Sequence, residues 1–219
     1  MLSVAERRGH ALVYQFDYHK RWHELLRPLR DLDLSVLEIG SASGASAKAF
    51  LELLPKAKLT CVDISFGGDF DANLGPLLGR LEKIEGRSLA ALEGLRANSR
   101  KFDVIYVDGS HTRDDALMDS IQSWRLLKDG GLIIWDDYVW GLGELPVEDR
   151  CKEAIDTFLG MHRHDLTVIE KGYQVYARKA GPQSGASSEF VEGFTYSRTF
   201  RNLCRFLTRK PLHRPHHGE

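Results

Sequence analysis

Short apolar runs alternate with segments of helical periodicity along most of the chain. The runs contain few polar residues and end at an acidic residue or a glycine, as strands do when a parallel sheet is covered on both faces. This alternation places the chain in the α/β class. The predicted strands are residues 36–39, 59–64, 81–85, 102–108 and 132–136.

The segments between these strands have helical patterns. Residues 44–54 carry an apolar stripe that ends before Pro55, because proline cannot continue a helix. A second helix is expected to begin after Thr112, a good N-cap residue, and to end at Gly130 and Gly131. Further amphipathic helices are predicted at residues 18–29 and 148–159.

Two further strands are predicted near the carboxyl end, at residues 166–169 and 174–177. The short link between them contains Gly172 and favours an antiparallel hairpin. We therefore predict a doubly wound, Rossmann-like sheet of seven strands in the order 3-2-1-4-5-7-6, with strand 7 antiparallel. Nicotinamide-binding folds, in contrast, keep all their strands parallel.

The composition divides the chain into three parts. Residues 1–35 form a predicted helical segment that covers the cleft at the sheet edge, and residues 36–180 form the main domain. From Gly181 a linker composition leads into a basic tail, residues 181–219. Apolar residues at helical spacing within residues 190–214 suit peripheral contact with an anionic membrane or a partner, or packing on the chain's own domain.

Composition and charge narrow the classes of function. The chain has 30 basic and 31 acidic residues, so its surface as a whole offers no field that would attract a nucleic acid. No apolar stretch is long enough for a signal peptide or a transmembrane helix. Its 3 cysteines lack metal-ligand spacing and are typical of free thiols in a reducing compartment. We therefore expect a cytoplasmic protein, and a homo-oligomer is left open.

The first strand runs into the turn Glu38-Ile-Gly-Ser-Ala-Ser-Gly44 and then into a helix. Such a turn presents helix N-terminal N–H groups to a ligand at the carboxyl edge of the sheet. A dinucleotide fingerprint has a second glycine where this chain has Ala42, so the turn suits an adenosine with an amino-acid tail. Glycines at such a junction can also serve packing alone. The predicted cofactor contacts here are Glu38, Gly40, Ser41, Ala42, Ser43 and Gly44.

The second predicted cofactor contact is Asp63, at the end of the second strand. Its place about twenty residues after the first turn suits an acidic group that accepts hydrogen bonds from both ribose hydroxyls. A turn or helix-cap role is the alternative. Ile64 follows it, and Arg87 and Ser88 after the third strand are candidates for adenine contacts or for ordinary turn chemistry.

Acidic residues also follow the fourth and fifth strands. Asp108 ends the fourth strand, and Asp136 and Asp137 end the fifth. Because neighbouring strand ends share one edge, the three carboxylates are expected to converge and to repel one another. Mg²⁺ prefers oxygen ligands and keeps positions open for substrate, so we predict a magnesium site. If Asp137 caps the following loop instead, only two acids face the cleft.

His111 is the predicted general base. It lies three residues after Asp108, at the start of a helix and the mouth of the acidic cleft. A histidine with an ordinary pKa of about 6.5 can accept a hydroxyl proton at neutral pH. A structural role at the helix start is the alternative. Asp108 is predicted to take part in catalysis and cofactor binding as well as in metal binding.

Aromatic residues near the cleft are candidates for binding a second substrate, since an aromatic face suits a sugar ring. Each of them is as well suited to the core. They are Tyr18, His19, Trp22, Tyr138 and Trp140.

Together these motifs resemble those of class I S-adenosylmethionine-dependent methyltransferases. Within that class, the chain is similar to the metal-dependent O-methyltransferases that include macrocin-type and mycinose-type sugar methyltransferases and cephalosporin-hydroxylase-like proteins. The likeness spans about residues 18–178 and depends on Val36 to Gly40, Asp63, Val107 to His111, and Asp136 to Tyr138. It implies that Asp108, Asp136 and Asp137 hold Mg²⁺ and that His111 is the base.

The chain departs from related families at a few positions. In catechol-type relatives a lysine stands at the position of His111, in the motif Asp-x-x-Lys, and an asparagine at the position of Asp137, in the motif Asp-Asn. The expected acceptor is therefore a sugar or alcohol hydroxyl rather than a catechol. Ala45 stands after Gly44 where the sugar group often has a second glycine.

The resemblance implies methyl transfer from S-adenosylmethionine, with Mg²⁺, to a hydroxyl of a sugar or natural-product acceptor. The alternative hypothesis is an S-adenosylmethionine-binding module without catalysis, which acts in an assembly through its basic tail. A nicotinamide-dependent oxidoreductase is disfavoured by Ala42 and by the predicted hairpin.

Overall fold

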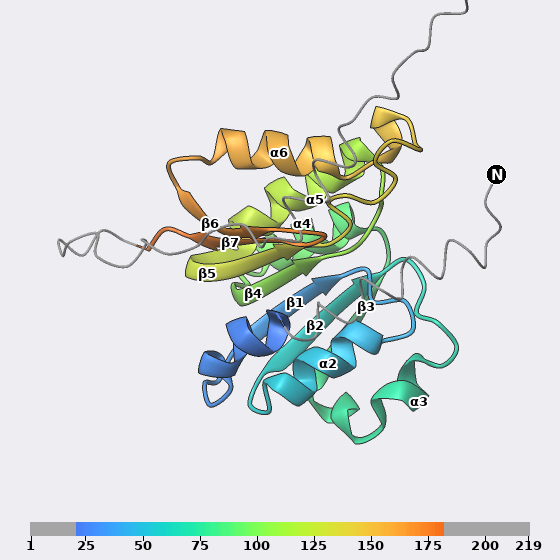
Figure 1. Cartoon of the computed structure of the whole chain (residues 1–219). Helices are drawn as coiled ribbons and strands as arrows, with labels where there is room; N and C mark the ends of the chain where they lie inside the picture. The colour runs from blue at the N-terminus through green and yellow to red at the C-terminus, as the bar shows by residue number, and fades with distance from the viewer. Residues whose placement is uncertain (1–20, 182–219) are drawn as a thin grey trace, which may run out of the picture.

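The computed structural model of the protein describes residues 21–181. Its centre is a seven-stranded sheet in the order β3-β2-β1-β4-β5-β7-β6 (Figure 1). Strand β7 is antiparallel to both of its neighbours, and the other neighbouring strands are parallel. The predicted class, strand order and reversed last strand are confirmed. The strands are β1 (Ser35–Ile39), β2 (Lys58–Asp63), β3 (Leu81–Glu85), β4 (Phe102–Val107), β5 (Leu127–Trp135), β6 (Leu166–Lys171) and β7 (Val175–Lys179).

Side chains alternate between the two faces of the sheet along each strand. In β4, Val104 and Tyr106 join the core cluster on one face, whereas Ile105 and Val107 join the cluster on the other. Both faces are covered, so the central strands have no solvated side. This explains why their sequences are continuous apolar runs rather than alternating ones.

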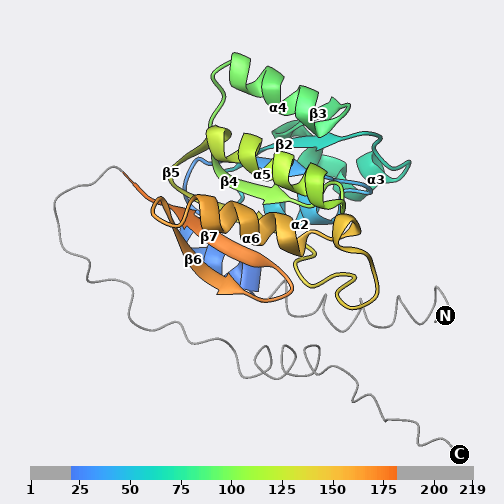
Figure 2. The same ribbon diagram turned by 90° about the horizontal axis from the view of Figure 1, so that it is seen from above.

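Helices form a layer on each face of the sheet (Figures 1 and 2). Helices α4, α5 and α6 pack side by side on the face of Ile105. Helix α2 covers the face of Tyr106, together with the helical residues 21–26. The helices are α2 (Ala45–Leu53), α3 (Phe70–Leu74), α4 (Ser88–Ala97), α5 (Arg113–Leu126) and α6 (Lys152–Met161), with 3₁₀ turns η1 (Arg27–Leu29), η2 (Gly75–Arg80) and η3 (Val147–Asp149).

Two of the predicted helix signals are confirmed. The hydroxyl of Thr112 caps α5 by accepting a hydrogen bond from the N–H of Asp115 at 3.4 Å. Helix α2 begins after Gly44, whose φ is +83°, and ends at Leu53, before Pro55. Glycine adopts this left-handed conformation without strain.

Other boundaries differ from the prediction. Helix α5 ends at Leu126, and Gly130 and Gly131 lie within β5 rather than at the helix end. The helix predicted over residues 148–159 begins instead at Lys152, because the residues before it form the 3₁₀ turn η3. Helix α4 has no counterpart among the predicted elements, since its buried stripe consists of two leucines only.

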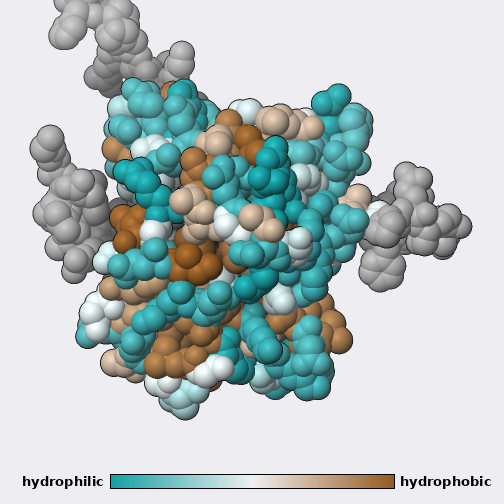
Figure 3. Space-filling model, turned by 180° about the vertical axis from the view of Figure 1, so that it is seen from behind, coloured by the Kyte–Doolittle hydropathy of each residue, from teal (hydrophilic) through white to brown (hydrophobic). Residues whose placement is uncertain are grey.

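The end of the predicted N-terminal segment packs with the main domain. Trp22 and Leu26 are buried in the core cluster beside α2. Residues 182–219, which include the predicted contact region 190–214, lie outside the described residues. No helix in the described range combines the length and the apolar character needed to cross a membrane. On the face shown in Figure 3, apolar residues lie in separate patches among hydrophilic ones.

Candidate functional site

Backbone hydrogen bonds extend the parallel pairing beyond the carboxyl ends of the central strands. The N–H of Asp108 donates to the carbonyl oxygen of Ile39 at 2.8 Å. The N–H of Asp136 donates to the carbonyl oxygen of Val107 at 3.0 Å. The residues that follow β1, β4 and β5 are therefore held at one edge of the sheet.

The turn after β1 passes very close to the backbone of β4. Gly40 has a φ of +84°, and a Cβ atom at this position would lie 1.9 Å from the carbonyl oxygen of Asp108. Only glycine combines this conformation with this contact. Ala42 also has a positive φ, of 43°, and its carbonyl oxygen accepts a hydrogen bond from the N–H of Gly67 at 2.8 Å. The turn is thus fixed on both sides.

Two acids hold the turn in place through hydrogen bonds. Oδ2 of Asp63 accepts hydrogen bonds from the N–H of Ser41 at 2.8 Å and of Ala42 at 2.7 Å. Glu38 is fully buried, and its Oε2 accepts from the hydroxyl of Ser41 at 2.6 Å and the thiol of Cys61 at 3.2 Å. Burial raises the pKa of Glu38. Asp63 therefore has the turn role that was the alternative to ribose binding, and its ribose contact stays a prediction.

A pocket of about 250 Å³ lies beside this turn. Residues 40–43, with Ala45 and Ser46, line one side of it with small residues. Its other walls are polar or aromatic and come from elements far apart in sequence. These lining residues are Trp22, Tyr106, Asp108, Asp136 and Gln174. The predicted turn residues from Gly40 to Ser43, but not Glu38 or Gly44, thus meet two of the predicted acids at one pocket. Its mixed walls suit an adenosine with an amino-acid tail.

The remaining cofactor candidates lie outside this pocket. Ile64 is 74% exposed, and Arg87 is an exposed residue just before α4. Ser88 begins α4 and hydrogen-bonds to Asp119, a buried carboxyl whose pKa burial raises to about 6. Asp119 was not among the predicted residues, because a carboxylate on a helix normally faces solvent. The adenine contacts of Arg87 and Ser88 stay predictions.

The carboxylates of Asp108 and Asp136 share one phenol. The hydroxyl of Tyr106 lies 3.1 Å from Oδ2 of Asp108 and 2.5 Å from Oδ2 of Asp136. Burial, and then repulsion from Asp136 and Asp137, raises the pKa of Asp108 well above its usual value. Burial and the charge of Asp137 likewise raise the pKa of Asp136 to about 6. The three carboxylates therefore converge, and the charge of Asp137 disfavours ionisation of Asp108 and Asp136.

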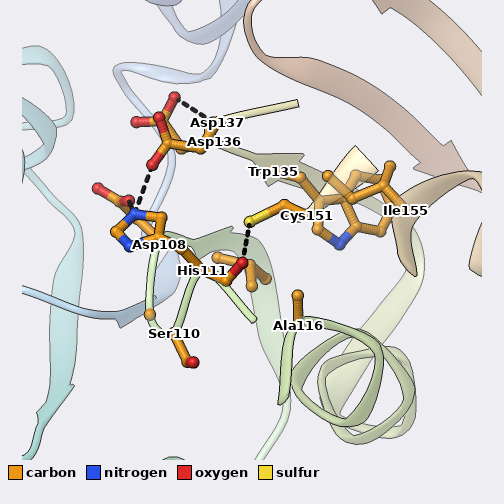
Figure 4. Close-up of a pocket in the computed structure, with 11 residues that line it drawn as sticks. Asp108, Ser110, His111, Ala116, Trp135, Asp136, Asp137, Cys151 and Ile155 are labelled. Atoms are coloured by element: carbon orange, nitrogen blue, oxygen red, sulfur yellow. Dashed lines mark hydrogen bonds and ion pairs between the residues drawn. The ribbon is translucent and has the colours of Figure 1, made fainter. Parts of the chain in front are cut away.

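His111 lies against these acids (Figure 4). Its Nε2 is 2.6 Å from Oδ2 of Asp137 and 4.0 Å from Oδ1 of Asp108. The hydrogen bond to Asp137 raises the pKa of His111, against the opposing effect of burial. Oδ1 of Asp137 accepts a hydrogen bond from the hydroxyl of Tyr173 at 2.5 Å. Burial raises the pKa of the nearby Cys151 thiol to about 12, which disfavours the reactive thiolate at neutral pH.

The cluster fits a divalent cation. Among the described residues, Asp108, His111 and Asp137 each place one ligand atom within 4.8 Å of the others. This grouping differs from the predicted trio, because the nearest partner of Asp136 is the Tyr106 hydroxyl. Carboxylate oxygens are the ligands that Mg²⁺ prefers, and a bound cation would relieve the repulsion that raises the carboxyl pKa values.

Residues 37–138 match a protein family described as a methyltransferase domain. Over these residues the chain is similar to a methyltransferase domain. The predicted resemblance to class I S-adenosylmethionine-dependent methyltransferases is thereby confirmed, in agreement with the strand order of the sheet. No curated protein sequence matches the chain.

Several solved methyltransferase structures share the fold at low sequence identity. One is MycE methyltransferase from the mycinamycin biosynthetic pathway, solved in complex with Mg, SAH and mycinamycin VI. Its sequence is 17% identical to this chain, and the TM-score is 0.61. The match covers 78% of this chain and 51% of MycE. The O-methyltransferase TomG from Streptomyces achromogenes, solved with SAM, is 22% identical with a TM-score of 0.61, over 83% and 92% of the two chains. A putative caffeoyl-CoA O-methyltransferase from Staphylococcus aureus is 19% identical with a TM-score of 0.59, over 83% and 93%. The present chain thus spans about half the length of MycE.

Two of the predicted substrate residues lie beside the site of the methyltransferase domain. Trp140 is 39% exposed, and its ring centroid lies 4.8 Å from that of His111. Trp22 is buried and stacks on Phe50 at 4.2 Å, but it also lines the cofactor pocket. An acceptor contact of Trp140 stays a prediction, whereas Trp22 belongs to the pocket wall.

A third predicted substrate residue, Tyr138, packs in the core instead of facing the site. Tyr138 is buried, and its hydroxyl donates to Asp156 at 2.9 Å. Lys152 and Lys171 both hydrogen-bond to the same carboxylate and lie over the Tyr138 ring. These contacts give Tyr138 a packing role in the methyltransferase domain rather than an acceptor contact. Tyr18 and His19 lie outside the described residues.

We predict that Gly40→Ala destabilises the methyltransferase domain by about 2–6 kcal/mol, because the added Cβ combines backbone strain with overpacking. Urea unfolding followed by circular dichroism measures this change. Gly94→Ala is the matched control, since Gly94 lies within α4 and an added Cβ meets nothing within 4 Å. The control should be neutral or stabilising by up to about 1 kcal/mol. Wild-type stability of Gly40→Ala would contradict the close approach of the turn to β4.

Proposed function

We propose that the protein is a magnesium-dependent O-methyltransferase that transfers a methyl group from S-adenosylmethionine to a hydroxyl of a sugar or other natural product. The observation that carries the proposal is the position of His111, with Nε2 2.6 Å from Oδ2 of Asp137 and 4.0 Å from Oδ1 of Asp108. Asp108 in turn lines the pocket beside the glycine turn. A proton acceptor therefore lies next to the pocket assigned to the methyl donor.

We assign S-adenosylmethionine to the pocket beside residues 40–43. The bound cofactor supplies an electrophilic methyl group on a positively charged sulfur. In this assignment Glu38 and the turn up to Gly44 hold the amino-acid end, while Asp63, Ile64, Arg87 and Ser88 are candidates for the nucleoside. Fixed backbone N–H groups and small side chains let this turn approach a ligand closely.

His111 is assigned the role of general base. Its contact with Asp137 fixes the imidazole ring and stabilises the imidazolium that forms when a proton is taken up. Because Nε2 faces Asp137, Nδ1 is left to accept the proton. With S-adenosylmethionine bound, the acceptor oxygen would form a bond to the methyl carbon as the carbon–sulfur bond breaks, and the hydroxyl proton would pass to His111. The products are a methyl ether and S-adenosylhomocysteine.

Asp108, Asp136 and Asp137 are the proposed magnesium ligands. A bound Mg²⁺ lowers the pKa of a hydroxyl that coordinates it. MycE, which has a similar fold, was solved with Mg and with mycinamycin VI, and this supports both a cation and a natural-product acceptor here. Trp140 beside His111 offers an aromatic face to such an acceptor.

The alternative of a noncatalytic module receives less support. A binding module has no need for an imidazole held beside three converging carboxylates, whose mutual repulsion costs stability. The cytoplasmic location, a homo-oligomer, and a membrane or partner contact through residues 190–214 remain predictions.

We predict that EDTA abolishes methyl transfer and that added Mg²⁺ restores it, because the partly buried carboxylates would hold the acceptor hydroxyl through a cation. Transfer from labelled S-adenosylmethionine is measured over a panel of glycans and polyketides. Calorimetry with S-adenosylhomocysteine in the same buffers shows whether the cofactor pocket is intact. Full activity in chelator would remove Asp136 and Asp137 from the metal role.

We predict that His111→Ala lowers kcat by a factor of about 10²–10⁴, the usual contribution of general acid–base catalysis, and leaves the affinity for S-adenosylhomocysteine unchanged. His164→Ala is the control, because His164 is an exposed histidine away from the acids. It should retain wild-type kcat. Near-normal turnover of His111→Ala would show that this histidine only begins the helix.

A further inference from the structure

A chain of buried hydrogen bonds runs from the N-terminal helical residues to the acid cluster. The indole Nε1–H of Trp22 donates to Oε1 of Gln174 at 2.9 Å, and the hydroxyl of Tyr176 donates to the same oxygen at 2.5 Å. Nε2 of Gln174 donates to the hydroxyl oxygen of Tyr106 at 3.4 Å. All four side chains belong to residues that are at most 4% exposed. This series of hydrogen bonds ends at the carboxylates of Asp108 and Asp136, which the Tyr106 hydroxyl contacts.

Trp22 fixes the donor-to-acceptor direction of this series of hydrogen bonds. An indole N–H can only donate a hydrogen bond, so the amide of Gln174 must turn its oxygen toward Trp22 and its NH₂ group toward Tyr106. A flipped amide would set two donors against each other at Trp22. Because the NH₂ group donates to the hydroxyl oxygen of Tyr106, the hydroxyl hydrogen is directed to a carboxylate.

The phenol of Tyr106 is itself held in position. Tyr106 and Asp108 lie on the same face, since they are two residues apart along the strand direction. The Tyr106 ring meets the rings of Trp22 and Phe50 edge-on, at centroid distances of 5.1 and 5.6 Å. Its hydroxyl therefore stays between Asp108 and Asp136, with one hydrogen for two acceptors.

We propose that Trp22, Gln174 and Tyr106 form a directional relay that positions the carboxylates of Asp108 and Asp136 for cation binding. The three are positioning residues, because they act on the cation through the two acids. The relay also gives Trp22 a role in the site that does not require contact with the acceptor. The cation part of this proposal rests on the proposed function, whereas the orientation of the carboxylates exists without a metal.

The effect on the carboxylates is tested in metal-free protein labelled with ¹³C at the aspartate carboxyl carbons. Trp22→Phe removes the indole N–H and keeps an aromatic ring beside Phe50. We expect the signals of Asp108 and Asp136, assigned by Asp→Asn variants, to shift while that of Asp156 stays in place. Tyr138→Phe is the matched control, because it removes a hydroxyl that donates to Asp156 at 2.9 Å. It should move the Asp156 signal only.

Magnesium titration of the same samples separates the relay from the proposed function. We expect Trp22→Phe to weaken Mg²⁺ binding by about 10–100-fold, as loss of a supporting hydrogen bond does at metal sites, and Tyr138→Phe to leave it unchanged. Carboxyl signals that shift in Trp22→Phe but ignore Mg²⁺ in the wild type would uphold the positioning and overturn the metal role. Wild-type signals and wild-type Mg²⁺ affinity in Trp22→Phe would overturn the relay.

Gln174→Met is the second variant, for the case that Trp22→Phe does not fold. It keeps the length of the side chain and removes both the acceptor and the donors of the amide. The same shifts of the Asp108 and Asp136 signals are expected. Unshifted signals in folded Gln174→Met would overturn the relay.

Discussion

The close approach of the turn at Gly40 to the backbone of Asp108 is the constraint on which the site depends. Strands β1 and β4 pair in parallel from Val36 with Val104 to Ile39 with Val107, so their carboxyl ends are level. The absence of a side chain at Gly40 lets the turn lie directly on the next residue of β4. The pocket beside the turn and the acid cluster therefore share Asp108, and a methyl donor and a hydroxyl acceptor can be brought together there.

The acid cluster is the second constraint, and it acts through charge. Burial and repulsion raise the pKa values of Asp108 and Asp136, and hydrogen-bond donors or a cation favour their charged forms. The surrounding structure supplies donors from Tyr106, Tyr173 and His111. Asp137 even adopts a positive φ of 57°, which is uncommon for a residue other than glycine and typical of functional sites. The fold thus maintains an arrangement that is costly without a ligand.

Local signals in the sequence predicted the sheet and most of the acids, because buried parallel strands are continuous apolar runs and acids at their ends share an edge. Contacts between distant segments were not predictable in this way. Tyr106 and Gln174 both lie in predicted strands with no sign of a site role, and only the folded sheet brings them to Trp22. Tyr138 follows Asp137 directly, yet its ring turns into the core. Helix α4 was missed because its apolar stripe is short.

The central claim is that Asp108, Asp136 and Asp137 bind a divalent cation while His111 stays free to accept a proton. Anomalous diffraction from crystals grown with Mn²⁺ and S-adenosylhomocysteine tests this most directly. We predict a manganese peak bound by the three carboxylates, with the imidazole of His111 outside the coordination shell. No peak at these carboxylates would contradict the metal role, and a peak bound by His111 would contradict its role as the base.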